Sequence, residues 1–291
     1  MPNKNHTCVL TTFYPGVEKF FDDFLESVQK QSVSDFDLVI VDDDGNDLEV
    51  FLANYKLPPT KIIFGNGNVA ENRSIGFRYV LEQGYKNLIL ADADDYFRDN
   101  RVAVSVDLLK QSEIDVVVND VHLCDQNGVV LLESYFSKRL SNNQKIDSTF
   151  LEHSNCCGLS NTSLKLACLR GIDLNFSGDV IDWTLYTRLS LKGANIVYTN
   201  RTHSIYRQYT ENVIGIGRDL SKSRLELCVN VKKMHYRLLA KQYPQYLTLA
   251  EYFDNLYTSI DSEDFEFYLS RCSNMLPDFP FWWEEAIYWE K

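Results

Sequence analysis

The chain has 291 residues and a formal net charge of -12 at pH 7, with 45% hydrophobic and 24% charged residues. These values are ordinary for a globular protein, and the length allows one large α/β domain with a helical appendage. The negative charge argues against a nucleic-acid partner, because proteins bind that polyanion through basic side chains. No apolar run approaches the roughly 18 residues of a membrane span, and the start lacks the apolar segment of a signal peptide. We therefore expect a cytoplasmic protein.

The N-terminal part of the chain alternates short apolar runs with amphipathic helical patterns. We expect strands at residues 8–13, 36–41, 61–64 and 88–91, and helices at 17–28, 48–55 and 70–83. Apolar runs without alternation are typical of strands that are buried on both faces. The order of these elements predicts a mostly parallel central sheet with right-handed crossovers, flanked by helices.

Two clusters of aspartates follow predicted buried strands. The first occupies residues 42–44, and the second consists of Asp92, Asp94 and Asp95. Because the carboxyl ends of parallel strands meet at one edge of a sheet, we expect both clusters at one cleft. Carboxylates are preferred ligands of Mg²⁺ and Mn²⁺, which can also carry substrate phosphates. The alternative for each cluster is a solvated turn or a helix cap.

The second part of the chain has a different order of elements. We expect a helix at 101–111, strands at 115–121, 129–132 and 196–198, helices at 161–170 and 182–191, and a mobile polar loop near the cleft at 134–145. After Gly217, longer patterns at 220–243 and 247–260 predict a helical appendage with an aromatic tail from Leu276. We expect this tail to pack back on the domain, and dimerisation or docking at a membrane interface are its alternatives.

Several segments resemble the family 2 glycosyltransferases of the GT-A fold, over roughly Thr7 to Gly217. The segments are CVLTTFYPG at 8–16, VIVDDDGND at 39–47, Asn68 with Arg73 and Gly76, LADADD at 90–95, GDVIDWTLYTRL at 178–189, and YRQYTEN at 206–212. The segment at 90–95 is similar to the family's metal-binding Asp-x-Asp motif. The resemblance implies a catalytic domain at 1–217, with a nucleotide-sugar half at about 1–98 and an acceptor half at about 99–217, and a helical region at 218–291.

The resemblance also implies roles for individual residues. Asp182 would be the catalytic base, and Asp94 with Asp92 would bind Mn²⁺ or Mg²⁺. The implied donor contacts are Thr11, Phe13, Asp42, Asp43, Asp44, Asn68, Arg73, Asp92, Ala93 and Arg207. The implied acceptor contacts are Trp183, Asp179 and Tyr209. We expect Asp43 to hydrogen-bond the edge of the base.

The implied activity is an inverting, metal-dependent transfer of a sugar from a UDP donor to a hydroxyl of a growing glycan or glycolipid. Such a protein would be at most peripheral at the inner face of the membrane, and it could form a homodimer through its C-terminal region. One alternative is a sugar-phosphate nucleotidyltransferase, although no basic, Gly-rich loop follows the first strand. Another is a catalytically silent nucleotide-sugar-binding protein, because Ile181 stands where Glu is usual and Tyr209 where His is usual.

Overall fold

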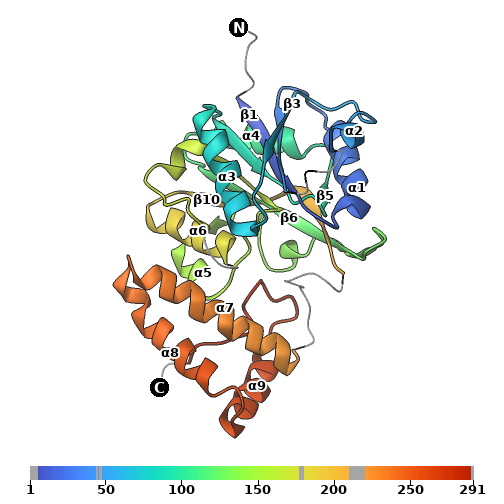
Figure 1. The fold of residues 1–291 in the computed structure, drawn as a ribbon. Helices are drawn as coiled ribbons and strands as arrows, with labels where there is room; N and C mark the ends of the chain where they lie inside the picture. Colours follow the sequence, from blue (N-terminus) through green and yellow to red (C-terminus); the bar gives the residue numbers. More distant parts are fainter. Residues whose placement is uncertain (1–5, 44, 46–47, 177–179, 210–219, 290–291) are drawn as a thin grey trace.

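The computed structural model describes residues 6–43, 45, 48–176, 180–209 and 220–289. A ten-stranded sheet forms its centre, with the strand order β3-β2-β1-β4-β9-β6-β10-β5 and with β7 and β8 paired at the side. Helices pack on the sheet, and three further helices lie together at the C-terminal end of the molecule (Figure 1). In the described part of the chain, no helix combines the length and the apolar composition that crossing a membrane requires.

The N-terminal elements follow the predicted alternation of strand and helix. They are β1 (Thr7–Phe13), α1 (Glu18–Gln29), β2 (Asp37–Asp42), α2 (Leu48–Leu52), β3 (Thr60–Phe64), α3 (Val69–Glu82) and β4 (Asn87–Leu90). β1 pairs in parallel with both β2 and β4, and β2 pairs in parallel with β3. The prediction of a parallel sheet is therefore confirmed in this half, and the carboxyl ends of β1, β2 and β4 lie at one edge.

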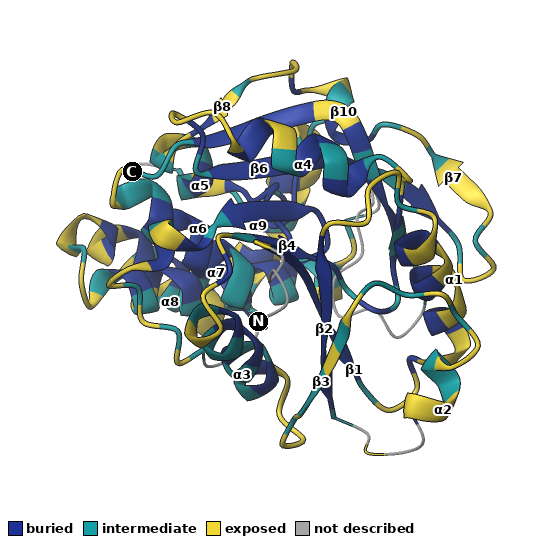
Figure 2. Cartoon of the chain, turned by 90° about the horizontal axis from the view of Figure 1, so that it is seen from above, coloured by how far each residue is buried: buried dark blue, intermediate teal, exposed yellow. Residues whose placement is uncertain are grey.

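The two faces of this parallel sheet are both covered, which explains the continuous apolar runs. Leu10 of β1 lies in a core cluster with residues of α3, whereas the next residue toward the N-terminus, Val9, lies in a cluster with residues of α1. Side chains alternate between the faces of a strand, so adjacent residues enter different cores. Figure 2 shows β1 and β2 buried, while the edge strands β3 and β7 (Val130–Leu132) carry exposed residues.

The second half of the sheet is mixed. Its elements are β5 (Tyr96–Phe97), α4 (Arg101–Leu109), β6 (Val116–Cys124), β7, β8 (Lys145–Ile146), α5 (Ser148–His153), β9 (Thr162–Lys165), α6 (Ile181–Leu191) and β10 (Ile196–Arg207). β6 and β10 are parallel, and β9 runs antiparallel between β4 and β6. The predicted hairpin of β6 and β7 is confirmed. The central sheet with flanking helices agrees with the predicted fold class.

One prediction in this half is wrong. Residues 161–170 do not form a helix, because the segment makes strand β9 and a short 3₁₀ helix at Leu166–Leu169. Pairing with two neighbouring strands outweighs its local helical pattern. The mobility expected for residues 134–145 stays a prediction, although the segment is anchored in the core, since Phe136 is completely buried and Tyr135 nearly so. Their aromatic rings supply the apolar contacts that hold this polar segment in place.

The C-terminal helices pack directly on the sheet-bearing part. They are α7 (Lys222–Ala240), α8 (Leu247–Thr258) and α9 (Glu263–Met275), and only α9 was not predicted. Ser262 caps α9 by accepting a hydrogen bond from the backbone of Phe265, a start signal that the sequence contains. From α7, Lys232 donates to the carbonyl of His153 at 2.7 Å. Buried residues before and after the predicted boundary at residue 217 share one hydrophobic cluster, so the division into two domains stays a prediction.

The aromatic tail packs back on the domain, as predicted. Phe281, Trp282 and Trp283 are each 5% exposed or less. Tyr135 donates to the carbonyl of Pro280 at 2.8 Å, and Arg139 forms an ion pair with Glu284. The rings that would favour a membrane interface are thus used inside the molecule.

The buried tail predicts a large loss of stability on truncation of a single ring. Trp283→Ala should lower the free energy of unfolding by about 3–5 kcal/mol, because it removes a large side chain from a packed core. Urea unfolding followed by circular dichroism measures this change. The matched control is Phe267→Ala on α9, whose side chain is 70% exposed, and it should change the free energy by less than about 0.5 kcal/mol. Equal effects of the two changes would contradict the packing described here.

Candidate active site

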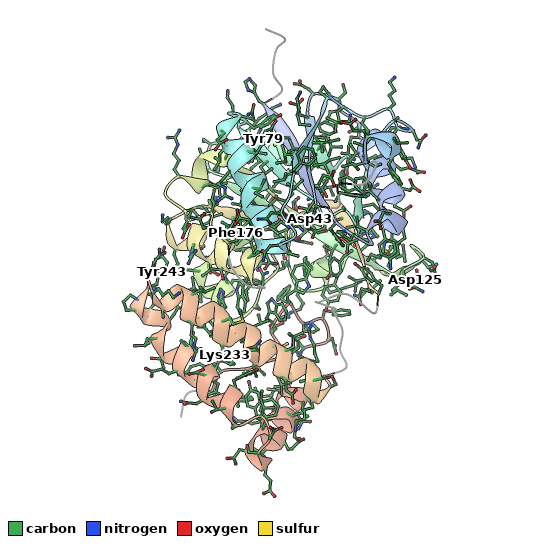
Figure 3. The ribbon with its side chains drawn as sticks, viewed as in Figure 1. Asp43, Tyr79, Asp125, Phe176, Lys233 and Tyr243 are labelled. Atoms are coloured by element: carbon green, nitrogen blue, oxygen red, sulfur yellow. The ribbon has the colours of Figure 1, made fainter. Side chains whose placement is uncertain are left out.

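A cleft of about 680 Å³ opens at the carboxyl ends of β1, β2 and β4. The residues that line it are Thr12, Tyr14, Pro15, Gly16, Lys19, Asp43, Val69, Asn72, Arg73, Asp92, Asp94, Asp95, Tyr206 and Tyr209. Residues of both acidic turns are among them, so the expected convergence at one edge of the sheet is present. Figure 3 shows Asp43 on the side of the sheet that faces the C-terminal helices.

Each aspartate of the second cluster has its own hydrogen-bond donor. Arg73 of α3 pairs with Asp92, and the hydroxyl of Tyr209 donates to Asp94 Oδ2 at 2.7 Å. Asp95 accepts from the hydroxyl of Ser160 and from the backbone N–H of Arg207 at 2.8 Å. Burial, followed by the charge of Asp92, raises the pKa of Asp94, and burial raises that of Asp95 well above its usual range. The two carboxylates nearest the cleft therefore repel each other.

A buried arginine lies under this cluster. Arg101 of α4 is completely buried, donates to the carbonyl of Leu90 at 2.6 Å, and also bonds the side chain of Asn119 at 3.1 Å. Burial lowers the pKa of Arg101 to about 9, while the charges of Asp95 and Asp92 raise it. The side chain stays protonated at neutral pH, so it provides a fixed positive charge behind the aspartates.

The first acidic turn is ordered by backbone donors. Asp42 accepts from the N–H of Gly45 at 3.0 Å, and Asp43 accepts from the N–H of Gly67. A Cβ atom at Gly65 would lie 2.6 Å from Asn72 Oδ1 and 2.8 Å from Asp43 Oδ1. A side chain at residue 65 would therefore displace the side chains of Asn72 and Asp43, so Gly65 lets the start of α3 pack against the end of β2.

Several expected donor contacts do not line the cleft. Thr11 is completely buried, and Phe13 and Ala93 belong to the core cluster beneath α1. Asn68 caps α3 by accepting from the N–H of Glu71. Asp44, like Asp179 of the acceptor set, lies outside the described residues.

Arg207, expected to contact the donor diphosphate, is buried and bonded to other parts of the chain. Its guanidinium is 1% exposed, and it bonds the carbonyls of Asp94 and Gln126 at 2.9 Å and the carboxylate of Asp23 at 2.5 Å. The residue thus holds the loop of the aspartates against the end of β10, and its pairing with a diphosphate stays a prediction.

Sequence reasoning missed seven side chains that line the cleft. They are Thr12, Tyr14, Pro15, Lys19, Val69, Asn72 and Tyr206. For Thr12 and Tyr14 the signal is strand alternation. Thr11 and Phe13 point into the core, so the residues that follow each of them point to the opposite face of the strand. For Asn72 the signal is helical spacing, since it lies three residues after Val69, which also lines the cleft.

Asp182 lies in the first turn of helix α6 and is held by two donors. Asp182 Oδ1 accepts from the backbone N–H of Trp183 at 2.7 Å, and Oδ2 accepts from Asn155 Nδ2 at 3.2 Å. Burial raises the pKa of Asp182 to about 6; the hydrogen bond from Trp183 lowers it and the charge of Asp92 raises it. Asp182 does not line the cleft itself, but its interaction with Asp92 places it near the aspartates. A carboxylate with this pKa is suited to accept a proton near neutral pH.

The expected acceptor residues beside Asp182 have different surroundings. Trp183 is completely buried, stacks on His235 with ring centroids 3.8 Å apart, and donates to the carbonyl of Leu151 at 2.7 Å. Its ring supports α6 from within the core. Tyr209 does line the cleft, and burial together with the charge of Asp94 raises the pKa of its phenol. It is therefore a neutral donor at physiological pH.

The second aspartate cluster offers a site that fits a hard divalent cation. In the described part of the chain, no group of three or more His, Cys, Asp and Glu side chains is arranged to hold a metal ion. Mg²⁺ and similar ions need fewer protein ligands, since one or two carboxylates with substrate phosphates and water suffice. Arg73 occupies one oxygen of Asp92 and Tyr209 one oxygen of Asp94, so a second oxygen of each can meet a cation. Such a cation would also relieve the repulsion between the two carboxylates.

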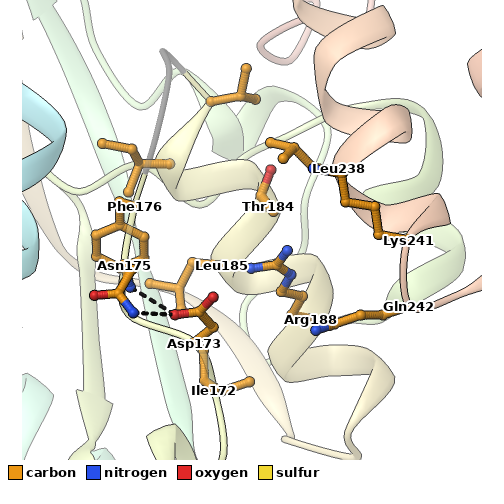
Figure 4. Close-up of a pocket in the computed structure, with 12 residues that line it drawn as sticks. Ile172, Asp173, Asn175, Phe176, Thr184, Leu185, Arg188, Leu238, Lys241 and Gln242 are labelled. Atoms are coloured by element: carbon orange, nitrogen blue, oxygen red, sulfur yellow. Dashed lines mark hydrogen bonds between the residues drawn. The ribbon is translucent and has the colours of Figure 1, made fainter.

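A second cavity, of about 220 Å³, lies between α6 and α7 (Figure 4). Arg188 from α6 and Lys241 from the end of α7 line it, together with Ile181. Ile181 is the position where the resemblance implies Glu, and it faces this cavity rather than the aspartate cleft. The substitution thus leaves the set of carboxylates in the cleft unchanged.

Comparison with known proteins gives related findings. The model of Glycosyl transferase family 2 matches residues 8–165. A protein of Methanocaldococcus jannaschii, named an uncharacterized glycosyltransferase, is 27% identical over 130 residues, which cover 43% of this chain and 44% of that protein. The chain therefore spans less than half the length of this relative.

Solved structures share the fold. S. aureus TarS in complex with UDP-GlcNAc has a TM-score of 0.60 at 13% identity, covering 92% of this chain and 78% of that one. GalNAc-T7 with UDP, GalNAc and Mn²⁺ has a TM-score of 0.54 at 14% identity, covering 96% of this chain and 60% of that one. Because the family model spans more than half of the sequence, the chain belongs to glycosyl transferase family 2.

Proposed function

We propose that this protein is an inverting glycosyltransferase that moves a sugar from a UDP donor to a hydroxyl of a growing glycan or glycolipid, with Mn²⁺ or Mg²⁺ as its cofactor. The acceptor would be a surface polysaccharide precursor on the cytoplasmic side of the membrane. The observation that carries the proposal is the meeting of Asp43, Arg73, Asp92 and Asp94 in one cleft. The UDP-GlcNAc bound to TarS, which has the same fold, supports the choice of donor.

The cleft provides separate places for the two ends of the donor. Asp43 lies at the carboxyl end of β2, where its carboxylate can accept a hydrogen bond from the N–H of a uracil base. Asp92 and Asp94 lie at the end of β4, on the other side of β1. Arg73, beside Asp92, supplies a guanidinium for the diphosphate. The base would thus bind near Asp43 and the diphosphate near Asp92 and Asp94.

The chemistry requires a positive partner for the leaving diphosphate and a base for the acceptor. A cation held by Asp92 and Asp94 would neutralise the charge that develops on the departing UDP. The hydroxyl oxygen of the acceptor forms a bond to the anomeric carbon of the sugar, and the bond between that carbon and UDP breaks. Asp182 accepts the proton that the hydroxyl loses. The raised pKa of Asp182, about 6, makes this carboxylate more basic than an exposed aspartate while leaving it ionised at neutral pH.

A catalytically silent nucleotide-sugar-binding protein is the second candidate. The observation that favours it is that both candidate metal ligands already have protein donors, Arg73 on Asp92 and Tyr209 on Asp94. Incubation with a panel of UDP-sugars and Mn²⁺, followed by measurement of UDP release, separates the two. Metal-dependent release of UDP from one donor supports the transferase, and tight binding of UDP without release from any donor supports the silent protein.

The metal proposal predicts the behaviour of Asp94→Ala. Wild-type protein should be stabilised by UDP in Mn²⁺, by about 2.7 kcal/mol at a hundredfold excess over the dissociation constant. The variant should lose this stabilisation and keep its metal-free melting temperature, because the lost carboxylate serves the ligand and not the core. Thermal unfolding followed by fluorescence measures both. Asp99→Ala, at a carboxylate that is 67% exposed, is the control and should behave as wild type. Unchanged UDP stabilisation in Asp94→Ala would refute the site.

The base proposal predicts the behaviour of Asp182→Asn. Transfer should fall by roughly 10²- to 10⁴-fold, the usual contribution of a general base. The affinity for UDP, measured by calorimetry, should stay within a factor of about two, because Asp182 acts on the acceptor. Transfer at the wild-type rate would move the base elsewhere, and Asp179 would be the next candidate.

The pKa of Asp182 predicts a dependence of transfer on pH. Only the ionised carboxylate accepts a proton, and its raised pKa of about 6 means that the fraction of ionised Asp182 increases as pH rises through that value. The logarithm of kcat/KM should therefore rise with pH below about 6 and level off above it. Initial rates between pH 4.5 and 8, at constant ionic strength and with roughly 10 mM Mn²⁺, measure the profile. A profile that stays flat down to pH 5 would exclude Asp182 as the titrating group.

A further inference from the structure

The C-terminal tail touches the segment that carries a partner of Asp182. Trp282 and Asn155 form an isolated antiparallel bridge, in which each backbone N–H donates to the carbonyl of the other, at 2.9 and 3.0 Å. This reciprocal pair fixes both the position and the orientation of the Asn155 backbone. Asn155 itself is completely buried.

The side chain of Asn155 has one orientation only. Its Oδ1 accepts from the backbone N–H of Cys157 at 2.9 Å, so the amide nitrogen must point the other way. That nitrogen donates to Asp182 Oδ2 at 3.2 Å and to the carbonyl of Cys157 at 3.3 Å. The amide therefore holds one carboxylate oxygen of Asp182, while the N–H of Trp183 holds the other.

The tail is itself held in a demanding conformation. The ring of Trp282 packs so closely on Gly158 that a Cβ atom there would lie 3.1 Å from it, and it meets the ring of Tyr206 in the cleft with centroids 5.8 Å apart. Trp283 has a left-handed backbone with φ of 67°. A residue with a side chain adopts that conformation only where its surroundings compensate for the strain, and such strain is often found at functional sites.

An ion pair anchors the end of this turn. Glu285 is 2% exposed and accepts two hydrogen bonds from Arg224 of α7, at 2.6 and 2.9 Å. The guanidinium of Arg224 also lies over the ring of Trp283, 5.3 Å from its centroid. Helix α7 thereby fixes the tail, and the tail fixes Asn155.

We propose that Asn155 is the positioning residue of Asp182 and that the backbone of Trp282 sets the position of Asn155, which makes the C-terminal tail part of the transfer site. The proposal rests on the proposed function, since it names what orients the base of that reaction. The carboxylate of Asp182 is held in a single orientation, and this requires that Asn155 and Trp183 both donate to it.

The hydrogen bond from Asn155 also favours the ionised form of Asp182, against burial and the charge of Asp92. Among the described residues, Cys157, Tyr186 and Tyr206 also interact with Asp182. Burial raises the pKa of each of these three, so all are neutral at physiological pH. The amide of Asn155 is thus the side-chain donor that stabilises the carboxylate.

The test compares Asn155→Ala with wild type at saturating UDP-sugar. We expect kcat to fall roughly 10- to 100-fold, as for a misplaced catalytic group. The KM for the donor should stay within about twofold, and the acid limb of the pH profile should move up by roughly one unit, because a hydrogen bond to a charged group is lost. Asn155→Ser is the second variant, in case the first does not fold. An unchanged acid limb in a folded variant would overturn the role of Asn155.

The role of the tail is tested by Trp282→Ala, which removes the ring that packs on Gly158 and Tyr206 and so loosens the backbone that bonds Asn155, and by the double variant with Asn155→Ala. If the tail acts through Asn155, Trp282→Ala should lower kcat by a smaller factor than Asn155→Ala does. The kcat of the double variant should then be no lower than that of Asn155→Ala alone. If the kcat of the double variant falls by the product of the two single reductions, the tail does not act through Asn155 and its proposed role is overturned. Asn142→Ala is the control, because the side chain of Asn142 bonds Thr199 at 3.0 Å and lies outside the site.

One measurement separates this proposal from the proposed function. The titration of Asp182 can be followed by NMR of carbon-13-labelled aspartate carboxyls, with the signal assigned from its loss in Asp182→Asn. The pKa should rise in Asn155→Ala and in Trp282→Ala and stay unchanged in Asn142→Ala, whether or not any donor is turned over. A wild type that releases no UDP would refute the transferase, whereas an unaltered Asp182 titration in both variants would refute the positioning role.

Discussion

The burial of negative charge at the carboxyl end of β4 is the constraint on which the rest of the structure depends. Asp92, Asp94 and Asp95 occupy one turn, and burial opposes their ionisation. An uncompensated buried charge is costly, so each carboxylate needs a donor or a cation nearby. The donors come from distant elements, α3 and the end of β10, while Arg101 of α4 adds a buried positive charge that interacts with Asp92 and Asp95. Satisfying the turn therefore requires the two halves of the sheet to meet.

This constraint also explains which residues remain available for a ligand. Asp95 is used to attach β10, since it accepts from the backbone of Arg207, and Arg207 in turn bonds the carbonyl of Asp94. Asp92 and Asp94 line the cleft and keep oxygen atoms for a cation. In this turn, Asp95 thus has a structural role, and Asp92 and Asp94 are the proposed ligands of a cation. Asp182, the proposed base, interacts with Asp92 from a separate element, helix α6, which packs in the same core as α7 and the tail.

The accuracy of the sequence-based interpretation differs between the two halves for a physical reason. Strands β1, β2 and β4 are parallel and buried almost throughout, so their apolar runs identify them locally, and the parallel edge strand β3 is identified by its short β-branched run. Strand β9 lies antiparallel between β4 and β6, and its short segment TSLK has no periodicity that distinguishes a strand from a helix. Helix α9 was missed although Ser262 and an acidic first turn mark its start. The sequence therefore contains a local start signal for α9, whereas the conformation of β9 is decided by its pairing with β4 and β6.

The sequence by itself determined the order of strands and helices in the N-terminal half, the convergence of two acidic turns and the resemblance that led to Asp182, because these follow from local patterns and strand direction. Only the tertiary structure decided which side chains enter the cleft. Strand alternation puts Thr11 and Thr12 on opposite faces of β1, but only the packing determines that the face of Thr12 opens into the cleft. The contacts of Asp182 with Asn155, and of Asn155 with Trp282, join segments far apart in the chain. No local pattern encodes such contacts, since they exist only when the packed core brings those segments together.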